Sequence, residues 1–137
     1  SGRRDRLRSD LLAKISASEA LTADNRLLTV TVAADYGGRW DITQALECLK
    51  KTGEEVSEGT ISRHLSLADL PNPQLFIRTG GEQRLSNFLL WQIAYTEIYF
   101  SDTLWPDFAE EDLKAAVEDY QGRERRFGRI SEQLEVD

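Results

Sequence analysis

The sequence predicts an α/β fold in which an open, mostly parallel sheet is covered by helices on both faces. Three short runs rich in apolar and β-branched residues have the character of strands, at 27–34, 75–77 and 98–100. Segments with apolar residues at helical spacing lie between these runs. Apolar strands that alternate with helices favour a parallel sheet with both faces buried.

The first part of the chain predicts a helix and then a strand. The helix is indicated by apolar residues at helical spacing, Leu7, Leu11 and Ile15, and it should end before the turn residues 23–25. Residues 27–34 then alternate leucine and valine with threonine, which predicts a strand.

The middle of the chain predicts two helices that lead into the second strand. Asp41 is expected to cap the first helix, and Gly53 is expected to end it. A shorter helix is predicted around 60–65. Pro71 and Pro73 then indicate a turn before the strand at 75–77.

The last part predicts a helix at about 86–94, the strand at 98–100 and a final helix. The 86–94 segment is apolar nearly all round and should therefore be buried. Asp107 and Glu110 have the spacing of a capping box for the final helix. Three strands make a thin sheet, so residues 1–137 are predicted to be part of one domain whose fold continues in residues absent from this chain.

Composition narrows the classes of partner. The chain has 137 residues and a formal net charge of −7, which disfavours general binding to nucleic acid or to an anionic membrane surface. Its single cysteine, Cys48, allows no internal disulfide and fits a reducing cytoplasm. No apolar run reaches the roughly 20 residues that a membrane span requires.

The candidate binding segment follows the second predicted strand. Arg78 lies at the carboxyl end of that strand, where open α/β sheets bind ligands. Gly80 and Gly81 allow close approach of the backbone, Arg84 adds a second guanidinium, and Ser86 is expected to cap a helix whose amino end favours an anion. Together these features suit a diphosphate. On the residues alone, a turn closed by an ion pair between Arg78 and Glu82 explains the segment equally well.

A family resemblance separates these two interpretations. The segment 77–92 and the later segment 105–108 resemble signature motifs of the cis-prenyltransferases, the family that includes bacterial undecaprenyl diphosphate synthases. The likeness continues through 19–22, 36–39 and 123–128. It implies that the chain is the carboxy-terminal half of one such catalytic domain. The family's Asp-Gly-Asn-Gly-Arg-Trp motif is absent, so the catalytic residues are expected to lie outside this half.

The resemblance also implies roles for individual residues. The diphosphate of isopentenyl diphosphate would be bound by Arg78, Arg84, Leu85 and Ser86. Glu97 corresponds to a glutamate that contacts Mg²⁺, while Arg126 and Gly128 belong to a motif that contacts a diphosphate across a dimer interface. Asp35 stands where the family usually has asparagine.

The implied activity of the full-length protein is a transferase reaction. Isopentenyl diphosphate would be added repeatedly to farnesyl diphosphate to give undecaprenyl diphosphate, the carrier-lipid precursor for the cell wall, in a cytoplasmic, Mg²⁺-dependent homodimer that comes close to a membrane to release product. The 137 residues alone are expected to be inactive. The alternatives are a noncatalytic partner subunit of a heteromeric prenyltransferase and a stand-alone phosphate-binding module.

Overall fold

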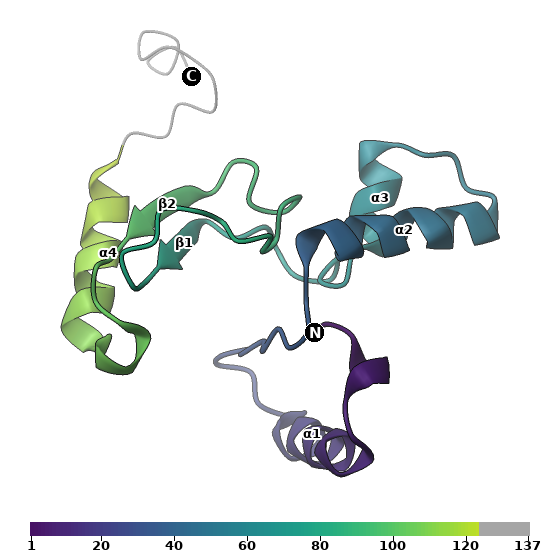
Figure 1. Cartoon of the computed structure of the whole chain (residues 1–137), viewed down its shortest axis with the longest axis horizontal. Helices are drawn as coiled ribbons and strands as arrows, with labels where there is room; N and C mark the ends of the chain where they lie inside the picture. The colour runs from purple at the N-terminus through teal and green to yellow at the C-terminus, as the bar shows by residue number, and fades with distance from the viewer. Residues whose placement is uncertain (124–137) are drawn as a thin grey trace, which may run out of the picture. The chain divides into compact units, whose positions relative to one another are not determined.

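The computed structural model describes residues 1–123, which form two compact units. The first unit is Ser1–Leu70 and the second begins at Pro71. Helices make up the regular structure of the first unit, whereas the second holds two parallel strands and a helix (Figure 1). The predicted mixed α/β class with a parallel sheet is confirmed. None of the helices within residues 1–123 is long and apolar enough to cross a membrane.

The predicted first helix is present as α1 (Ser9–Thr22), after a short 3-10 turn at Arg4–Arg6. It stops just before Ala23, as the turn residues indicate. Leu7 lies in the link that precedes the helix rather than on it. No residue of α1 is buried, so this helix has an apolar stripe without a packed partner.

The strand predicted at 27–34 is wrong for this chain. These residues are not a strand, although the backbone around Val32–Asp35 bonds to the first residues of the chain. A β-strand is stable only when a neighbour satisfies its backbone groups along its length. Within residues 1–123 that neighbour is only Ser1–Arg3, which is too short to extend the pairing to Leu27.

Two helices form the packed part of the first unit. They are α2 (Gly38–Thr52) and α3 (Glu58–His64), and Ala45, Leu49 and Leu65 are buried between them and the following link. Gly53 ends α2 as predicted, in the left-handed region with φ of 73°. The predicted short helix is present and begins earlier than expected, because Ser57 and Thr60 cap its amino end reciprocally.

Asp41 is not the cap that the sequence predicted. Gly37 occupies the N-cap position, and Asp41 lies within the first turn of α2, almost completely buried. Its carboxylate accepts hydrogen bonds from the Tyr36 hydroxyl (2.8 Å), from Gln44 Nε2 (3.1 Å), and from Ser66 through the backbone N–H (2.9 Å) and the hydroxyl (2.6 Å). Asp41 therefore links the start of α2 to the chain that follows α3.

The second unit is built on the parallel pair β1 (Leu75–Arg78) and β2 (Glu97–Phe100). Leu75 lies opposite Glu97, and Arg78 lies opposite Phe100. Both strands were predicted, with bounds that differ by one residue. The helix α4 (Glu110–Gly122) packs beside β2 (Figure 1), and its Ala116 is buried.

The helix predicted at 86–94 is wrong. The segment forms consecutive turns, because Ser86, Asn87 and Leu89 have positive φ values that interrupt a right-handed helix. It still packs inward on one side, where the ring of Phe88 lies 6.2 Å from that of Phe76 and Ile93 is buried. A helix that is apolar on every side needs neighbours on every side, and this packing provides neighbours on only one side.

The start of α4 also differs from the prediction. Asp107 belongs to a 3-10 turn at Trp105–Asp107 and does not cap the helix. The capping carboxylate is that of Asp112, which accepts the backbone N–H of Ala109 (2.9 Å). Acidic side chains are common in both segments, and their spacing alone did not identify the turn at which the helix begins.

Candidate functional site

Arg78 is positioned by a ladder of backbone hydrogen bonds that continues beyond β1 and β2. The Ser101 N–H donates to the Arg78 carbonyl (2.8 Å), and the Gly81 N–H donates to the Ser101 carbonyl (3.0 Å). The Gly80 N–H reaches the Thr103 carbonyl (2.8 Å). The turn after β1 is therefore held against the segment after β2, at the carboxyl edge of the sheet where α/β proteins bind ligands.

The two glycines of this turn are required by its backbone. Gly80 has φ of 84° and Gly81 has φ of 73°, which is the left-handed region that strains other residues. A Cβ on Gly81 would also approach Asp102 Oδ1 to 3.4 Å. The turn is thus a narrow, side-chain-free surface beside Arg78.

The Arg78 side chain has an unmet donor. Its Nε is buried and has no hydrogen-bond partner, a condition that it shares among the described residues only with the Ser1 hydroxyl. A guanidinium carries five N–H donors and no acceptor, and a buried donor without a partner lowers stability. The geometry therefore suits an acceptor that is external to the described chain, placed beside Arg78.

The ion pair between Arg78 and Glu82, the alternative explanation of this segment, is not the contact that forms. Glu82 instead pairs with Arg84, whose side chain is 65% exposed. The turn is thus not closed by Arg78, which removes the main support for the purely structural interpretation of this segment. Arg84 lies in the same loop, but its side chain pairs with Glu82 and is not fixed in a position to bind a ligand.

Leu85 and Ser86 follow Arg84, and the predicted cap is not formed there. Ser86 is exposed, has φ of 51° and begins no helix. The amino end of a helix therefore contributes nothing to anion binding in this arrangement. The candidate site consists of Arg78, the two glycines and, within the same loop, Arg84.

Glu97 lies at the opposite end of the sheet from Arg78. Because β1 and β2 are parallel and Glu97 is opposite Leu75, its carboxylate is near the amino edge, about 10 Å along the strands from the level of Arg78. It accepts a hydrogen bond from Arg123 Nη1 (2.9 Å), and Arg123 also pairs with Asp119. The bond to Glu97 raises the pKa of Arg123 above its usual value.

The side chains within residues 1–123 do not form a metal-binding cluster. They include no group of three or more acidic, histidine or cysteine side chains that could hold a metal ion. Mg²⁺ commonly takes one or two protein carboxylates together with phosphate oxygens and waters, so Glu97 fits as a single ligand of a larger set. The predicted residues Arg126 and Gly128 lie outside the described residues.

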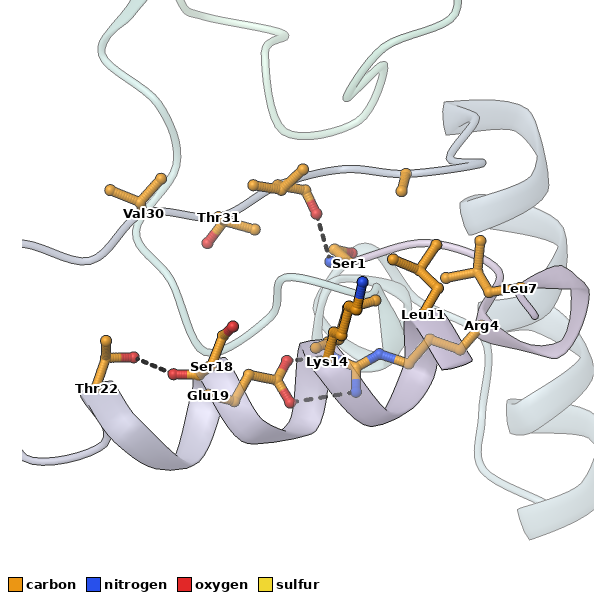
Figure 2. Close-up of a pocket in the computed structure, with 13 residues that line it drawn as sticks. Ser1, Arg4, Leu7, Leu11, Lys14, Ser18, Glu19, Thr22, Val30 and Thr31 are labelled. Carbon is orange, nitrogen blue, oxygen red and sulfur yellow. Dashed lines mark hydrogen bonds and ion pairs between the residues drawn. The ribbon is translucent and has the colours of Figure 1, made fainter. Parts of the chain in front are cut away.

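A groove in the first unit was not predicted. It has a volume of about 610 Å³ and lies between α1 and the extended segment around Val30–Ala34. Figure 2 shows Leu7, Leu11 and Lys14 along one side and Val30 and Thr31 along the other. Arg4 and Glu19 form an ion pair across its α1 side. Both apolar patterns were visible in the sequence, but periodicity does not reveal which two faces will be neighbours.

Comparison with known proteins places the chain in a family. The family model described as putative undecaprenyl diphosphate synthase matches residues 1–128. The chain belongs to this family.

Relatives of the undecaprenyl diphosphate synthase family are similar to almost the entire chain. An isoprenyl transferase of Neisseria gonorrhoeae is 59% identical over 98% of this chain and 55% of its own length. A ditrans,polycis-undecaprenyl-diphosphate synthase of Pseudomonas putida, named as (2E,6E)-farnesyl-diphosphate specific, is 47% identical over 98% of this chain and 57% of its own length. The chain therefore spans about half the length of the curated relatives it matches.

Two solved structures have a fold similar to that of this chain. A probable undecaprenyl diphosphate synthase from Campylobacter jejuni superimposes with a TM-score of 0.85 at 36% identity, over 94% of this chain and 61% of that structure. Lavandulyl diphosphate synthase from Lavandula x intermedia, solved in complex with dimethylallyl diphosphate, gives the same TM-score at 40% identity, over 93% of this chain and 58% of that structure.

Proposed function

We propose that this chain is the carboxy-terminal half of a cis-prenyltransferase catalytic domain and that it binds the diphosphate of isopentenyl diphosphate. The observation that carries the proposal is the buried, unpartnered Nε of Arg78 beside the side-chain-free turn at Gly80 and Gly81. A diphosphate oxygen is a charged acceptor that can complete this donor, and a planar guanidinium binds phosphate through more than one N–H.

The remaining members of the predicted site take supporting roles. Arg84 can reach a diphosphate once it leaves the surface ion pair with Glu82, which costs little because exposed ion pairs contribute little stability. Leu85 and Ser86 follow it in the same loop and are proposed to close over the ligand. Because Leu85 is half-buried and Ser86 is exposed in a turn, their binding arrangement is expected to form when the ligand or the rest of the domain is present.

The proposed reaction of the full-length protein is the repeated addition of isopentenyl diphosphate to farnesyl diphosphate. The name of the Pseudomonas putida relative supports both the farnesyl substrate and an undecaprenyl product, in place of the lavandulyl product of the plant protein. In this scheme, Arg78 holds the attacking substrate by its diphosphate and orients its double bond toward the allylic carbon.

Magnesium, when bound, would supply charge stabilisation for the diphosphate that leaves the allylic substrate. Glu97 is proposed as one of its ligands. We further propose a cytoplasmic homodimer, in which Arg126 and Gly128 contact a diphosphate of the partner subunit, and which approaches a membrane for product release. Nucleic acid is not proposed as a partner, given the acidic composition.

Titration of isopentenyl diphosphate into the full-length protein tests the site. Arg78→Ala should lose about 2 to 5 kcal/mol of binding free energy, the range for removing one partner of a buried charged contact. The matched control is Arg26→Ala, since Arg26 is an exposed arginine in the first unit that bonds mainly to carbonyl groups of its own turn. Unchanged affinity in Arg78→Ala would reject the assignment.

Two further measurements separate the competing functions. If the protein is only a phosphate-binding module, inorganic pyrophosphate should bind as tightly as isopentenyl diphosphate and no chain elongation should occur. If it is a noncatalytic partner subunit, the full-length protein alone should not elongate farnesyl diphosphate, even with Mg²⁺ present. The proposed function requires elongation by the full-length protein and a preference for the prenylated diphosphate.

A further inference from the structure

The turn beside Arg78 depends on other residues for its shape. Gly80 and Gly81 have positive φ values, and neither has a side chain that could fix its own backbone. Glycine has more accessible backbone conformations than any other residue, so bonds from neighbouring segments must restrain such a turn. These bonds therefore determine what fraction of the molecules present the turn in the shape that suits a diphosphate.

The restraining bonds come from the residues that follow β2. The Ser101 carbonyl accepts the Gly81 N–H (3.0 Å), and the Thr103 carbonyl accepts the Gly80 N–H (2.8 Å). Both glycine amides are thus used within the protein, where they fix the turn instead of binding a ligand. The position of the Thr103 carbonyl is therefore part of what defines the candidate site.

Thr103 is itself held by two further hydrogen bonds. Its N–H donates to the Ser101 hydroxyl oxygen (3.2 Å), which belongs to the same short link. Its own hydroxyl donates to Asp112 Oδ1 (2.9 Å). Asp112 lies on α4, which packs beside β2 (Figure 1). The hydroxyl bond therefore fastens the link after β2 to a packed helix.

The Asp112 carboxylate is well suited to this task because both of its oxygens are used. Oδ2 accepts the Ala109 N–H (2.9 Å) at the start of α4, while Oδ1 accepts the Thr103 hydroxyl. An ionised carboxylate only accepts hydrogen bonds, so the Thr103 hydroxyl must be the donor. This requirement fixes the orientation of the Thr103 side chain.

We propose that Thr103 and Asp112 are positioning residues for the candidate diphosphate site. Asp112 fixes Thr103, and the Thr103 carbonyl fixes the glycine turn beside Arg78. The inference rests on the proposed function of this site, and it assigns neither side chain a contact with the substrate. Loss of the hydroxyl bond frees the link, so fewer molecules hold the turn in the binding shape and the apparent affinity falls in proportion.

Thr103→Val separates this role from the capping of α4. Valine has nearly the shape of threonine and lacks the hydroxyl, and the bond from Ala109 to Asp112 remains. In the full-length protein, Thr103→Val should raise the Kd and the KM for isopentenyl diphosphate about threefold to tenfold, the factor expected for one lost hydrogen bond. The KM for farnesyl diphosphate should not change, because this turn is proposed to bind isopentenyl diphosphate. Thr103→Ser keeps the hydroxyl and should bind as the parent protein does.

The matched control is Tyr120→Phe. The Tyr120 hydroxyl donates to Gln74 Oε1 (3.2 Å), so it also joins α4 to the strand pair. Gln74 directly precedes β1, which places this contact at the amino edge of the sheet, away from the turn. Tyr120→Phe should leave the Kd for isopentenyl diphosphate unchanged. Equal weakening in Tyr120→Phe and Thr103→Val would overturn the proposal, because it would show a general effect of loosening α4.

Arg78→Ala, measured in parallel, separates failure of this inference from failure of the site. Parent-like affinity in Thr103→Val together with weakened binding in Arg78→Ala would overturn the positioning role and leave the site in place. Parent-like affinity in both variants would reject the site and, with it, the role of Thr103 and Asp112.

Amide hydrogen exchange tests the same restraint without any substrate. In the full-length protein, the Gly80 amide should exchange about threefold to tenfold faster in Thr103→Val than in the parent, because its acceptor is less firmly held. Tyr120→Phe should leave this rate unchanged. Equal exchange of the Gly80 amide in Thr103→Val and the parent protein would contradict the proposal.

Discussion

Two substitutions distinguish two roles of Glu97, that of a Mg²⁺ ligand and that of an ion-pair partner. In the described structure it is half-buried and forms an ion pair with Arg123, while the family resemblance assigns it to Mg²⁺. Glu97→Gln in the full-length protein should lower turnover and raise the Mg²⁺ concentration needed for half-maximal activity, because an amide is a poorer ligand for a hard cation. Activity measured against Mg²⁺ concentration provides this comparison.

The control for Glu97 is Arg123→Gln, which breaks the same ion pair and leaves the carboxylate in place. If Glu97 serves Mg²⁺, the control should keep its normal Mg²⁺ requirement. An equal change in both variants would mean that Glu97 acts only through the ion pair, and the metal assignment would be withdrawn.

Asp41 is expected to be a stability residue. It is buried, and its carboxylate accepts bonds from Tyr36, Gln44 and Ser66. Asp41→Ala should lower the free energy of unfolding of the full-length protein by roughly 1 to 3 kcal/mol, because buried donors lose their acceptor. Denaturant unfolding measures this, with the exposed α2 residue Glu47→Ala as a control expected to stay within about 0.5 kcal/mol.

Single residues could be predicted from the sequence where the local backbone decides their role. The positions of Arg78 at a strand end and of Gly53 at a helix end follow from local pattern and are confirmed. The partner of Glu82 and the burial of Asp41 could not be predicted, because both depend on which segments become neighbours in space. Sequence spacing shows which residues are able to form a contact, but it does not show which of these contacts forms in the folded chain.

At the scale of elements, Asp112 joins α4 to the segment beside the candidate site. Its carboxylate accepts the Ala109 N–H and the Thr103 hydroxyl, each at 2.9 Å, and Thr103 in turn binds Gly80 through its carbonyl. The bonds to the Ala109 backbone and then to Thr103 favour the charged form and hold the pKa of Asp112 below its usual value.

This lowered pKa predicts a pH dependence with a definite sign. Asp112 stabilises the folded state fully above the ordinary aspartate pKa, about 3.9, and loses that contribution as the pH falls through its lower folded value. The difference in unfolding free energy between the parent protein and Asp112→Asn should therefore be constant at neutral pH and shrink below about pH 3.9. Thr103→Val removes one hydrogen-bond donor to Asp112, so the folded-state pKa of Asp112 should lie closer to its ordinary value. The stabilisation by Asp112 should then be lost over a narrower pH range. A difference that grows on acidification would contradict the sign.

Elements formed as predicted where their neighbours lie within the same unit. The strands at 75–78 and 97–100 pair with each other, and α2 and α3 pack together, so their patterns led to the observed structure. The segments 27–34 and 86–94 carry equally clear patterns and adopt neither predicted element. Each needs more neighbours than residues 1–123 provide, so local pattern alone was insufficient.

At the scale of the whole molecule, we propose that the chain is part of a longer domain. It matches the undecaprenyl diphosphate synthase family over residues 1–128 and spans about half the length of its curated relatives. The exposed apolar segment in the first unit is explained if further residues cover it. We therefore propose that this part of the domain binds the diphosphate and that the complete domain is needed for turnover.

The most direct test of this assignment uses isotope-labelled isopentenyl diphosphate with farnesyl diphosphate and Mg²⁺. Incorporation of label into long-chain product is compared between the 137-residue chain and the full-length protein at equal concentration. We expect long-chain product from the full-length protein and none from the 137-residue chain. Long-chain product from the 137 residues alone would reject this division of the active site, because it would show that residues outside this chain are not needed for catalysis.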